Sequence, residues 1–258
     1  MPKVSVIMSV YNNADYLKRA IQSVLNQSFF DFEFIIINDN SSDSTEEFID
    51  SFSDQRIVYI KNLENKGLIY NLNVGLKIAK GYYIARLDGD DFLSDQDKLK
   101  KQVDFLDKNQ DFALVGTMAK AVNNEGKELF EIVYPKDNNE IKRRLLFENC
   151  FVHSSVLFRK NISQMCGNYL DSEKYIEDYG LWLRMGVEHK LFNLSDFSVY
   201  YFLNSSGETQ KNNLMQINEI LKLIRKHKNN YSYYFFSLLC GLCKYLIVSV
   251  GGLQSTNL

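Results

Sequence analysis

Short apolar runs and amphipathic stretches alternate along the first part of the chain. The apolar runs are rich in β-branched residues, as in buried strands, and the stretches between them place apolar residues at helical spacing. This alternation predicts an α/β fold with a mostly parallel sheet and helices on both of its faces. The expected strands span 4–10, 34–37, 57–60 and 82–87, and the expected helices lie at 17–25, 48–52 and 68–79.

The pattern changes beyond residue 110. Two apolar segments, 113–122 and 129–134, flank the sequence NNEGKE and predict a hairpin. The second half is therefore expected to add a mixed or antiparallel part to the parallel first half. Its other expected elements are a helix at 141–147, a strand at 152–158, a helix at 175–188 and one or two strands within 191–203.

The last part of the chain is expected to form helices. Apolar residues at helical spacing within 217–224 precede the sequence RKHKNN and the apolar run 231–253, which Lys244 interrupts. The run is near the lower length limit for a membrane span. Basic residues followed by aromatic and aliphatic ones favour a helix that lies on an anionic membrane surface. The alternative is a helix pair that packs on the domain or on a second subunit. We expect a domain at 1–210 and a helical extension at 211–258.

Composition and charge exclude some classes of function. The chain has 258 residues, of which 45% are hydrophobic, and a formal net charge of -2, so no strong field attracts nucleic acid. The cysteines are too scattered for a disulfide framework. Cys240 and Cys243 form a C-x-x-C inside an apolar run, and we interpret them as small apolar side chains of a helix. The N-terminus lacks a signal-peptide pattern, which favours a cytoplasmic location.

Acidic residues follow two of the predicted strands. Asp88, Asp90 and Asp91 come directly after the fourth strand in the sequence DGDD, and Asp39 follows the second. In parallel sheets, ligands bind beyond the carboxyl ends of the strands. Carboxylates there suit a hard cation such as Mg²⁺ or Mn²⁺, which a substrate diphosphate would share. Gly89 is expected to allow unusual backbone angles and a close approach of the ligand. Taken alone, the cluster is a weak signal, and a solvated acidic turn would be the preferred interpretation.

Two common phosphate-binding devices are absent from the sequence. The first strand–helix turn, SVYNNADY, has no glycine, which argues against a dinucleotide-binding Rossmann unit, and no G-x-x-x-x-G-K-[ST] loop occurs. If phosphate is bound, the aspartates must act on it indirectly by holding a cation.

Five segments occur together in the order found in one enzyme family. The chain resembles the inverting family 2 glycosyltransferases, which have the GT-A fold, and the resemblance covers roughly the first 200 residues. It implies that 1–110 binds the nucleotide sugar and that 111–210 binds the acceptor. The segments are VSVIMSVYNNADYLKRAIQSVLNQSF, FIIINDNSSDST, ENKGLIYNLNVGLKIAKGYYIARLDGDD, VHSSVLFRK and IEDYGLWLR.

The resemblance also implies roles for individual residues. Asp39 would bind uracil, Asp90 would be the best metal ligand, and Asp88 would contribute to the metal on the ribose side. Asp178 would be the general base, with Glu177 beside it. Asp91 is an additional acid of the nucleotide site, and the other expected nucleotide contacts are Ser9, Tyr11, Asn12, Lys66 and Asn73.

The sequence departs from the family at two positions. Asn38 stands where the family often has aspartate, and Asn204 stands where a histidine often contacts the metal or phosphate. No third protein ligand to the metal is therefore assigned.

The resemblance implies metal-dependent transfer of a sugar, with inversion. The expected donor is a UDP-hexose or UDP-N-acetylhexosamine, and the expected acceptor is a hydroxyl of a glycan or lipid-linked molecule in surface polysaccharide synthesis. The enzyme would work in the cytoplasm, at the inner face of the membrane if the extension binds lipid. A homo-oligomer is one expected possibility for its oligomeric state. The alternatives are a sugar-phosphate nucleotidyltransferase, which would want a glycine-rich loop, and a non-catalytic sugar-nucleotide-binding subunit.

Five residues have two interpretations each. Glu177 and Asp178 could be acids that complement a helix N-terminus. Trp182 could stack on a sugar or pack in the core. Arg184 could reach phosphate or, as we favour, pair with an acid. His153, expected on a strand, could contact substrate or be a hydrogen-bonded structural histidine.

Overall fold

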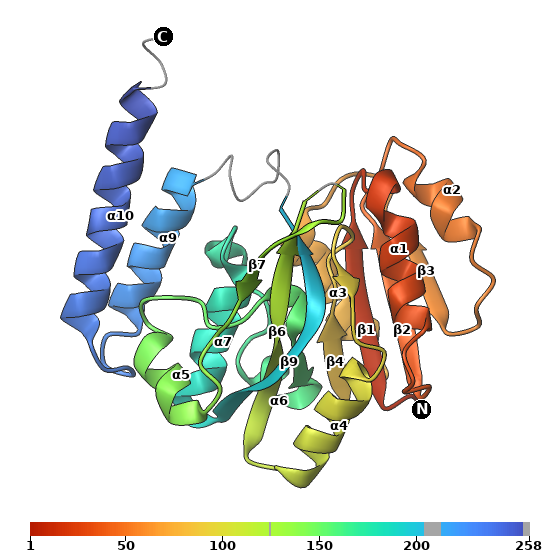
Figure 1. Cartoon of the computed structure of the whole chain (residues 1–258), viewed down its shortest axis with the longest axis horizontal. Helices are drawn as coiled ribbons and strands as arrows, with labels where there is room; N and C mark the ends of the chain where they lie inside the picture. Colours follow the sequence, from red (N-terminus) through yellow and green to blue (C-terminus); the bar gives the residue numbers. More distant parts are fainter. Residues whose placement is uncertain (124, 204–212, 255–258) are drawn as a thin grey trace.

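One mixed sheet with helices on both faces forms the body of the protein (Figure 1). The computed structural model describes residues 1–123, 125–203 and 213–254, leaving aside a few side chains at the ends of the last segment. Within these residues the sheet has nine strands in the order β3-β2-β1-β4-β8-β6-β9-β5, and β7 pairs with β6.

The first half of the sheet is parallel, as predicted. Its strands are buried apolar runs, and its helices present apolar residues to them on one side. The strands are β1 (Val4–Val10), β2 (Phe32–Asn38), β3 (Ile57–Lys61) and β4 (Tyr83–Arg86), and the helices are α1 (Ala14–Leu25), α2 (Thr45–Asp50) and α3 (Leu68–Ile78).

Side chains alternate between the two faces of each buried strand. In β2, Ile35 and Ile37 join the core on one face, and Phe34 and Ile36 join the core on the other. Helices α1, α2 and α4 (Lys98–Lys108) supply the second core, whereas α3 and α7 (Glu177–Glu188) supply the first. A strand buried on both faces must be apolar throughout, which explains the continuous run FIII.

The second half is mixed, as predicted. Strand β8 (Leu157–Arg159) runs antiparallel between β4 and β6 (Phe112–Val122), while the long β9 (Lys190–Phe202) lies parallel to β6. The expected hairpin joins β6 to β7. The remaining elements are β7 (Glu128–Ile132), β5 (Phe92–Leu93), α5 (Asn138–Arg144), α6 (Lys160–Met165) and the 3₁₀ turns η1 (His153–Ser155) and η2 (Asp171–Glu173).

The predicted strand over 152–158 was wrong in its first half. Residues His153–Ser155 form the 3₁₀ turn η1, and only Leu157–Arg159 pair with the sheet. The turn forms because the buried hydroxyls of Ser154 and Ser155 hydrogen-bond to neighbouring groups, so these residues do not extend the strand. The apolar residues around them gave no sign of it.

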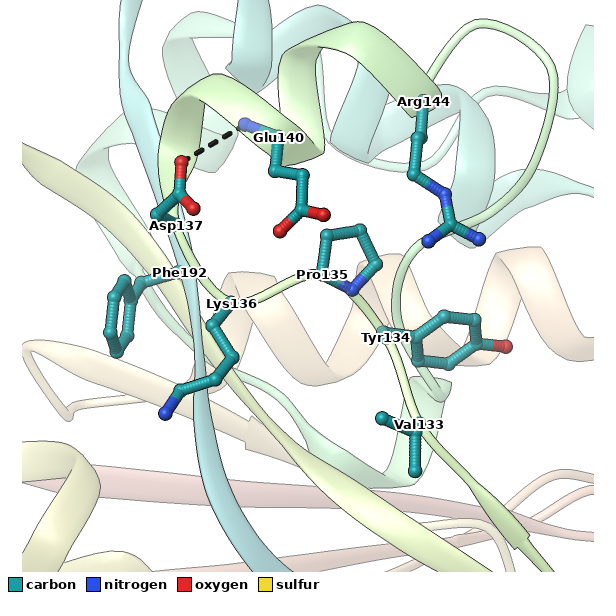
Figure 2. Close-up of a pocket in the computed structure, with 8 residues that line it drawn as sticks. All are labelled: Val133, Tyr134, Pro135, Lys136, Asp137, Glu140, Arg144 and Phe192. Atoms are coloured by element: carbon teal, nitrogen blue, oxygen red, sulfur yellow. Dashed lines mark hydrogen bonds between the residues drawn. The ribbon is translucent and has the colours of Figure 1, made fainter.

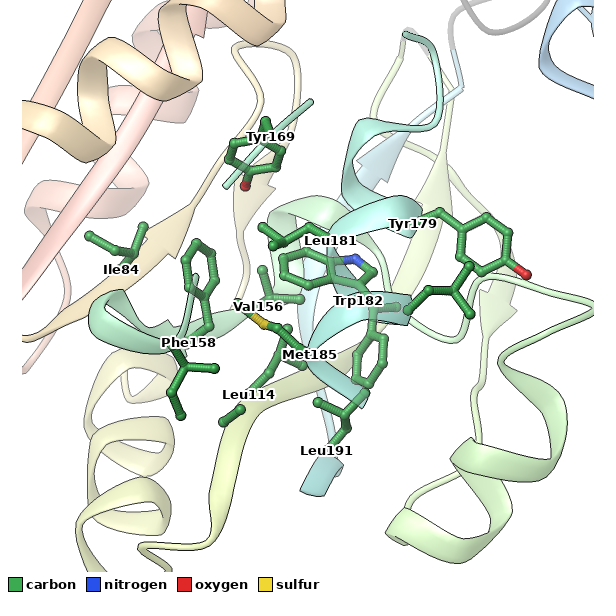
Figure 3. Packing of buried hydrophobic residues seen from close by; sticks show 14 of the residues in the cluster. Ile84, Leu114, Val156, Phe158, Tyr169, Tyr179, Leu181, Trp182, Met185 and Leu191 are labelled. Atoms are coloured by element: carbon green, nitrogen blue, oxygen red, sulfur yellow. The ribbon is translucent and has the colours of Figure 1, made fainter. Parts of the chain in front are cut away.

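Trp182 lies in the centre of the core (Figure 3). Its side chain is fully buried, and the rings of Phe151, Phe158 and His153 surround it at centroid distances of 6.3, 5.6 and 6.1 Å. This confirms the core-packing interpretation of Trp182 over sugar stacking.

The C-terminal extension is a helix pair, α9 (Asn213–Lys226) and α10 (Tyr234–Gln254), at the edge of the molecule (Figure 1). Leu223 and Ile224 of α9 are buried in the same core as Trp182. The alternative that the pair packs on the domain is therefore observed. The expected boundary at 210 lies outside the described residues. No helix in the described part of the chain is long and apolar enough to cross a membrane.

Candidate active site

The acidic sequence DGDD follows β4 at the carboxyl end of the parallel strands, where it was expected. Asp88 is paired with the buried guanidinium of Arg86. Burial would raise the pKa of Asp88, but Arg86 outweighs that effect and holds it below its usual value. Burial and then the charge of Asp88 raise the pKa of Asp90 to about 6. Asp88 is therefore ionised at a lower pH than its neighbour Asp90, as is usual for two carboxylates that interact.

The structure requires glycine at position 89 for a reason that differs from the expected one. Its φ is not positive; instead, a Cβ at this position would lie 2.9 Å from Val10 and 3.2 Å from Asn13. Glycine is needed because the end of β1 and the turn after it press against the loop. The expectation of unusual backbone angles at Gly89 was wrong.

Asp91 ties the acidic loop to the rest of the site. Its Oδ1 accepts a hydrogen bond of 2.9 Å from the Phe202 amide at the end of β9, and Ser154 Oγ donates to its Oδ2. The Asp88 amide in turn donates to Ser154 Oγ at 3.0 Å. Burial, followed by the charges of Asp90 and Asp88, raises the pKa of Asp91 well above its usual value. The expected nucleotide contact of Asp91 stays a prediction that must coexist with these bonds.

Arg86 is a fully buried cation at the base of the site. Its guanidinium donates to the carbonyls of Ile7 and Leu87 at 2.9 and 2.7 Å and pairs with Asp88. Its Nε donates to His153 Nε2 at 3.3 Å. Arg86 ends β4 and donates to Ile7 of the neighbouring β1, so the sheet holds the guanidinium in place beside Asp88.

His153 is a neutral, structural histidine. Burial and then the charge of Arg86 lower its pKa to about 3. Its Nε2 accepts from Arg86 and lies 3.0 Å from the hydroxyl of Tyr169. This supports the hydrogen-bonded structural interpretation of His153.

Asp39 is almost completely buried and binds the loop before α3. Its Oδ1 accepts from Asn62 Nδ2 at 2.7 Å and from the Lys66 amide at 2.8 Å, and its Oδ2 accepts from the Gly67 amide at 2.8 Å. Burial would raise the pKa of Asp39, but these hydrogen bonds together outweigh it and lower the pKa. A carboxylate offers about four lone-pair positions, and a hydrogen bond from the Asn71 side chain also lowers the pKa of Asp39, so this carboxylate is close to saturated.

A polar chain links Asp39 to the first strand. Asn62 also donates to Asn71 at 2.7 Å, and Asn71 donates to Ser9 Oγ at 3.1 Å. Asn38, where the family often has aspartate, is buried and hydrogen-bonds Tyr59 and the Ser41 amide. Its amide therefore supports the turn after β2.

The turn after β1 is joined to the turn after β2. Asn12 has a positive φ of 53°, its amide donates to Ser41 Oγ, and its Oδ1 accepts from the Ser42 amide at 2.8 Å. Tyr11 beside it is exposed. The structure thus places Ser9, Tyr11 and Asn12 at the same sheet edge as Asp39.

Glu177 and Asp178 begin helix α7 and are far along the chain from the acidic loop at 88–91. Burial and then the charge of Asp178 raise the pKa of Glu177 to about 8. Burial also raises the pKa of Asp178, against hydrogen bonds from the Tyr179 amide and from Asn149 Nδ2. The charge of Asp88 acts on both acids, and His153, which accepts from Arg86, packs against Trp182 of α7, so the two acidic segments lie near one another.

Three further side chains have partners within the protein. The amide of Asn73 pairs with the backbone of Tyr169 through bonds of 2.8 and 3.3 Å, so its expected nucleotide contact stays a prediction. Arg184 pairs with the buried Glu173, which confirms pairing with an acid. Lys66 pairs with Glu64 at the surface.

The residues present fit a hard cation only together with a substrate. In the described residues, no group of three or more His, Cys, Asp or Glu side chains could hold a metal alone. Asp90 forms no ion pair with a described basic side chain, whereas Asp88 is paired with Arg86. One or two carboxylates plus phosphate oxygens are the usual Mg²⁺ set in such enzymes. Asp90 is therefore the better ligand of the two.

A hollow of about 540 Å³ lies in the second half of the domain (Figure 2). Tyr134, Pro135 and Phe192 give it apolar surface, and Lys136 and Arg144 give it cations. Burial, then the charges of Cys150 and Asp178, raise the pKa of Tyr134 to about 12.

Some residues of the site carry no local sequence signal. Arg86 and Ser154 belong to the matching segments, but their bonds to Asp88 and Asp91 depend on pairing of β4 with the segment around β8. Asn62 and Asn149 lie in loops and are recognisable only once the chain is folded.

Comparison with known proteins identifies relatives of the whole domain. The family model described as Glycosyl transferase family 2 matches residues 5–163. The O-antigen biosynthesis glycosyltransferase WbnJ of Escherichia coli is 33% identical over 261 residues, covering 95% of this chain and 96% of the relative. The UDP-Glc:alpha-D-GlcNAc-diphosphoundecaprenol beta-1,3-glucosyltransferase WfaP of E. coli is 29% identical over 241 residues, covering 87% of each.

Solved structures share the fold at low sequence identity. The S. aureus TarS 1-349 structure in complex with UDP-GlcNAc has a TM-score of 0.72 at 18% identity, covering 95% of this chain and 71% of that one. The mannosyltransferase PcManGT from Pyrobaculum calidifontis, in complex with GDP-Man and Mn2+, has a TM-score of 0.68 at 14% identity, covering 99% and 79%.

Proposed function

The chain belongs to glycosyl transferase family 2 and has the GT-A fold, and on this premise we propose that it transfers a sugar from a UDP-sugar to an acceptor hydroxyl with inversion. We place the acceptor among the glycans or lipid-linked intermediates of surface polysaccharide synthesis, on the cytoplasmic side of the membrane. The names of WbnJ and WfaP support this choice. Membership of a glycosyltransferase family removes the nucleotidyltransferase and the non-catalytic subunit from consideration.

The observation that carries the proposal is the electrostatic joining of two distant acidic segments. Asp88 and Asp90 follow β4, Asp178 begins α7, and the charge of Asp88 acts on Asp178. An inverting displacement needs a base on one side of the sugar and stabilisation of the leaving group on the other. Carboxylates from two segments, about ninety positions apart, suit these two tasks.

Asp178 is the proposed base. Asn149 and the Tyr179 amide fix its carboxylate, which can accept the proton of the acceptor hydroxyl as the hydroxyl oxygen attacks the anomeric carbon. The raised pKa of Asp178 makes it a stronger base than an exposed aspartate. Glu177, whose pKa is about 8, stays largely protonated at neutral pH and is less suited to the task.

The donor would lie between Asp39 and the acidic loop. We propose that the ionised carboxylate of Asp39 accepts the uracil N–H and that Asp88 binds on the ribose side. A bound Mg²⁺ or Mn²⁺, held by Asp90 with a contribution from Asp88, would stabilise the negative charge of the leaving UDP. The hollow beside Tyr134 and Arg144 is the candidate position for the part of the acceptor beyond its reacting hydroxyl.

The experiment is a screen of UDP-sugars with Mn²⁺, read as UDP release and as protection against thermal unfolding. At least one UDP-sugar should raise the melting temperature, and chelation of the metal should abolish the effect. The absence of any response to uridine nucleotides would contradict the donor assignment. The anomeric configuration of the product, determined by NMR, tests inversion.

The base assignment has its own variant. Asp178→Asn should lower kcat by about 10²–10⁴-fold while nucleotide binding persists, as expected for loss of a general base. Asp171→Asn, at an exposed position in η2, is the matched control and should leave kcat unchanged. Full activity of the Asp178→Asn enzyme would reject the assignment.

A further inference from the structure

The outer face of α10 exposes several large apolar side chains. Phe235 is 83% exposed, Leu239 is 60% exposed and Leu242 is 40% exposed, and they follow one another at spacings of four and three residues. Such spacing places them in one stripe along the helix. Phe236, half exposed beside the stripe, contacts Phe147 of the domain. We call Phe235, Leu239 and Leu242 the outer stripe.

The opposite face of α10 is packed against α9. Ser237 and Gly241 are buried, and a Cβ at Gly241 would lie 2.7 Å from Leu221 of α9. The absence of a side chain at Gly241 lets the two helices approach closely. The orientation of α10 is therefore set by this contact, and the outer stripe lies on the exposed side of the helix, opposite Ser237 and Gly241.

The charge of this part of the chain is one-sided. Residues 220–258 contain no Asp or Glu, but they contain lysines and arginines. Lys222 and Lys226 pair with Glu219 and Glu173. The exposed basic residues for which no ion pair is found within the described chain are Arg225, Lys228 and Lys244.

Lys244 lies about half a turn around α10 from the outer stripe, so it does not share this face. We propose that the outer stripe, together with Arg225 and Lys228, binds the surface of an anionic lipid bilayer. Apolar side chains gain free energy by entering the headgroup region, and basic residues near an anionic surface add about 1 kcal/mol each. Phe235 stands at the start of α10, close along the chain to Lys228, so aromatic and cationic groups lie at the same end. This combination suits the boundary between headgroups and acyl chains.

A second copy of the chain fits this surface less well. A twofold interface would bring the outer stripe of one copy against that of its partner. Lys228, which is close along the chain to Phe235, would then approach its counterpart in the other copy, and residues 220–258 supply no acid to pair with it. Like charges brought together oppose association.

The proposed surface is fixed to the helix that carries the candidate base. Tyr231 donates a hydrogen bond of 2.7 Å to the Leu183 carbonyl of α7, and Lys226 reaches the buried Glu173, which pairs with Arg184 of α7. Removal of the extension would uncover the buried Leu223 and Ile224. Point variants of the exposed stripe in the full-length chain are therefore the sharper test.

The experiment measures sedimentation of the full chain with vesicles of equal parts phosphatidylcholine and phosphatidylglycerol. Leu239→Glu should lower the partition coefficient by about tenfold or more, because burial of a leucine side chain contributes 1.5–3 kcal/mol. Lys228→Gln should lower it by about fivefold on these vesicles and leave binding to pure phosphatidylcholine unchanged. Binding to the mixed vesicles should weaken as salt is added.

Controls separate membrane binding from other effects. Phe30→Ser, at a side chain that is 73% exposed far from α10, should not change partition. Leu239→Glu should keep the wild-type melting temperature, and Phe235→Ser provides a second stripe variant if it does not. Equal partition of wild type and both stripe variants would overturn the inference. A lipid-free dimer that Leu239→Glu converts to a monomer would overturn it in favour of a second copy.

The test does not depend on the proposed reaction. Partition into vesicles is read without turnover, so a chain that binds vesicles but ignores UDP-sugars would support the surface and contradict the chemistry. A chain that uses a UDP-sugar but does not bind vesicles would support the proposed reaction and contradict the membrane surface.

Discussion

The side-chain amide of Asn149 donates a hydrogen bond of 2.9 Å to Oδ2 of Asp178, which lies 29 residues further along the chain. The bond joins the loop after α5 to the first turn of α7. It stabilises the ionised carboxylate, because an amide donor favours the charged form of an acid. The orientation and the basicity of the candidate base therefore both depend on a residue outside the helix that carries it.

Asn149→Ala should raise the pKa of Asp178 further. A hydrogen bond to a charged group is worth about 1.5–3 kcal/mol, so the rising limb of the pH–rate profile should move up by about one pH unit or more. Profiles of kcat/KM against pH measure the shift. Asn139→Ala, at an exposed position in α5, should leave the profile in place. An unmoved profile in Asn149→Ala would show that the bond does not tune the base.

Glu177 should make the folded protein less stable as the pH rises. Its pKa is about 8 when folded and near 4.5 when exposed, so between these values the unfolded chain loses a proton that the folded chain keeps. Raising the pH in this window therefore favours unfolding, by about 1.4 kcal/mol per pH unit. Glu177→Gln removes the titration. The difference in unfolding free energy between variant and wild type should grow from pH 5 to about pH 8.

The measurement for Glu177 is urea unfolding at several pH values. Other buried acids, such as Asp91, give slopes of the same sign, so only the difference between the two proteins reports on Glu177. A difference that stays constant with pH would mean that Glu177 ionises normally in the folded state.

Arg86→Met should destabilise the fold strongly. The change leaves Asp88 without its cation and the carbonyls of Ile7 and Leu87 without their donor, all in a buried region. Breaking a buried pair by removing one partner costs about 3–5 kcal/mol. Urea unfolding measures the loss. Arg143→Met, at an exposed position in α5, should stay within about 0.5 kcal/mol of wild type.

Ser154→Ala should weaken nucleotide binding more than it weakens the fold. The hydroxyl connects the Asp88 amide to Asp91, so its loss frees the acidic loop that is expected to bind UDP. The melting-temperature increase produced by UDP with Mn²⁺ should shrink. Ser155→Ala is the matched control, because its hydroxyl bonds only to the Val152 carbonyl. Equal increases in both variants would argue against a role for Ser154 in holding the loop.

The parallel half of the fold could be predicted from the sequence because its signals are local. The run VSVIMSV is buried on both faces of the sheet, and only a central strand explains it. The position of the acids followed from the same reasoning, since parallel strands end at one edge. In this half of the protein, the local pattern of apolar residues and the observed sheet agree.

The remaining features depend on contacts between distant segments. The sequence around Asp39 does not predict that the backbone amides of Lys66 and Gly67 will donate hydrogen bonds to its carboxylate. The antiparallel insertion of β8 beside β4 is likewise a matter of tertiary pairing, and it turned the expected strand at His153 into a 3₁₀ turn. Periodicity reports which face is buried, and it does not report the partner.

The near saturation of Asp39 bears on which nucleotides the site would accept. Hydrogen bonds keep this carboxylate ionised, so towards a nucleotide base it can only accept a hydrogen bond and cannot donate one. Uracil offers a ring N–H there, whereas cytosine offers a lone pair at the same ring position. Two acceptors facing each other in a buried site repel and stay unsatisfied, a mismatch that polar sites reject by about 10⁴-fold or more. One ring proton would then separate uridine from cytidine donors.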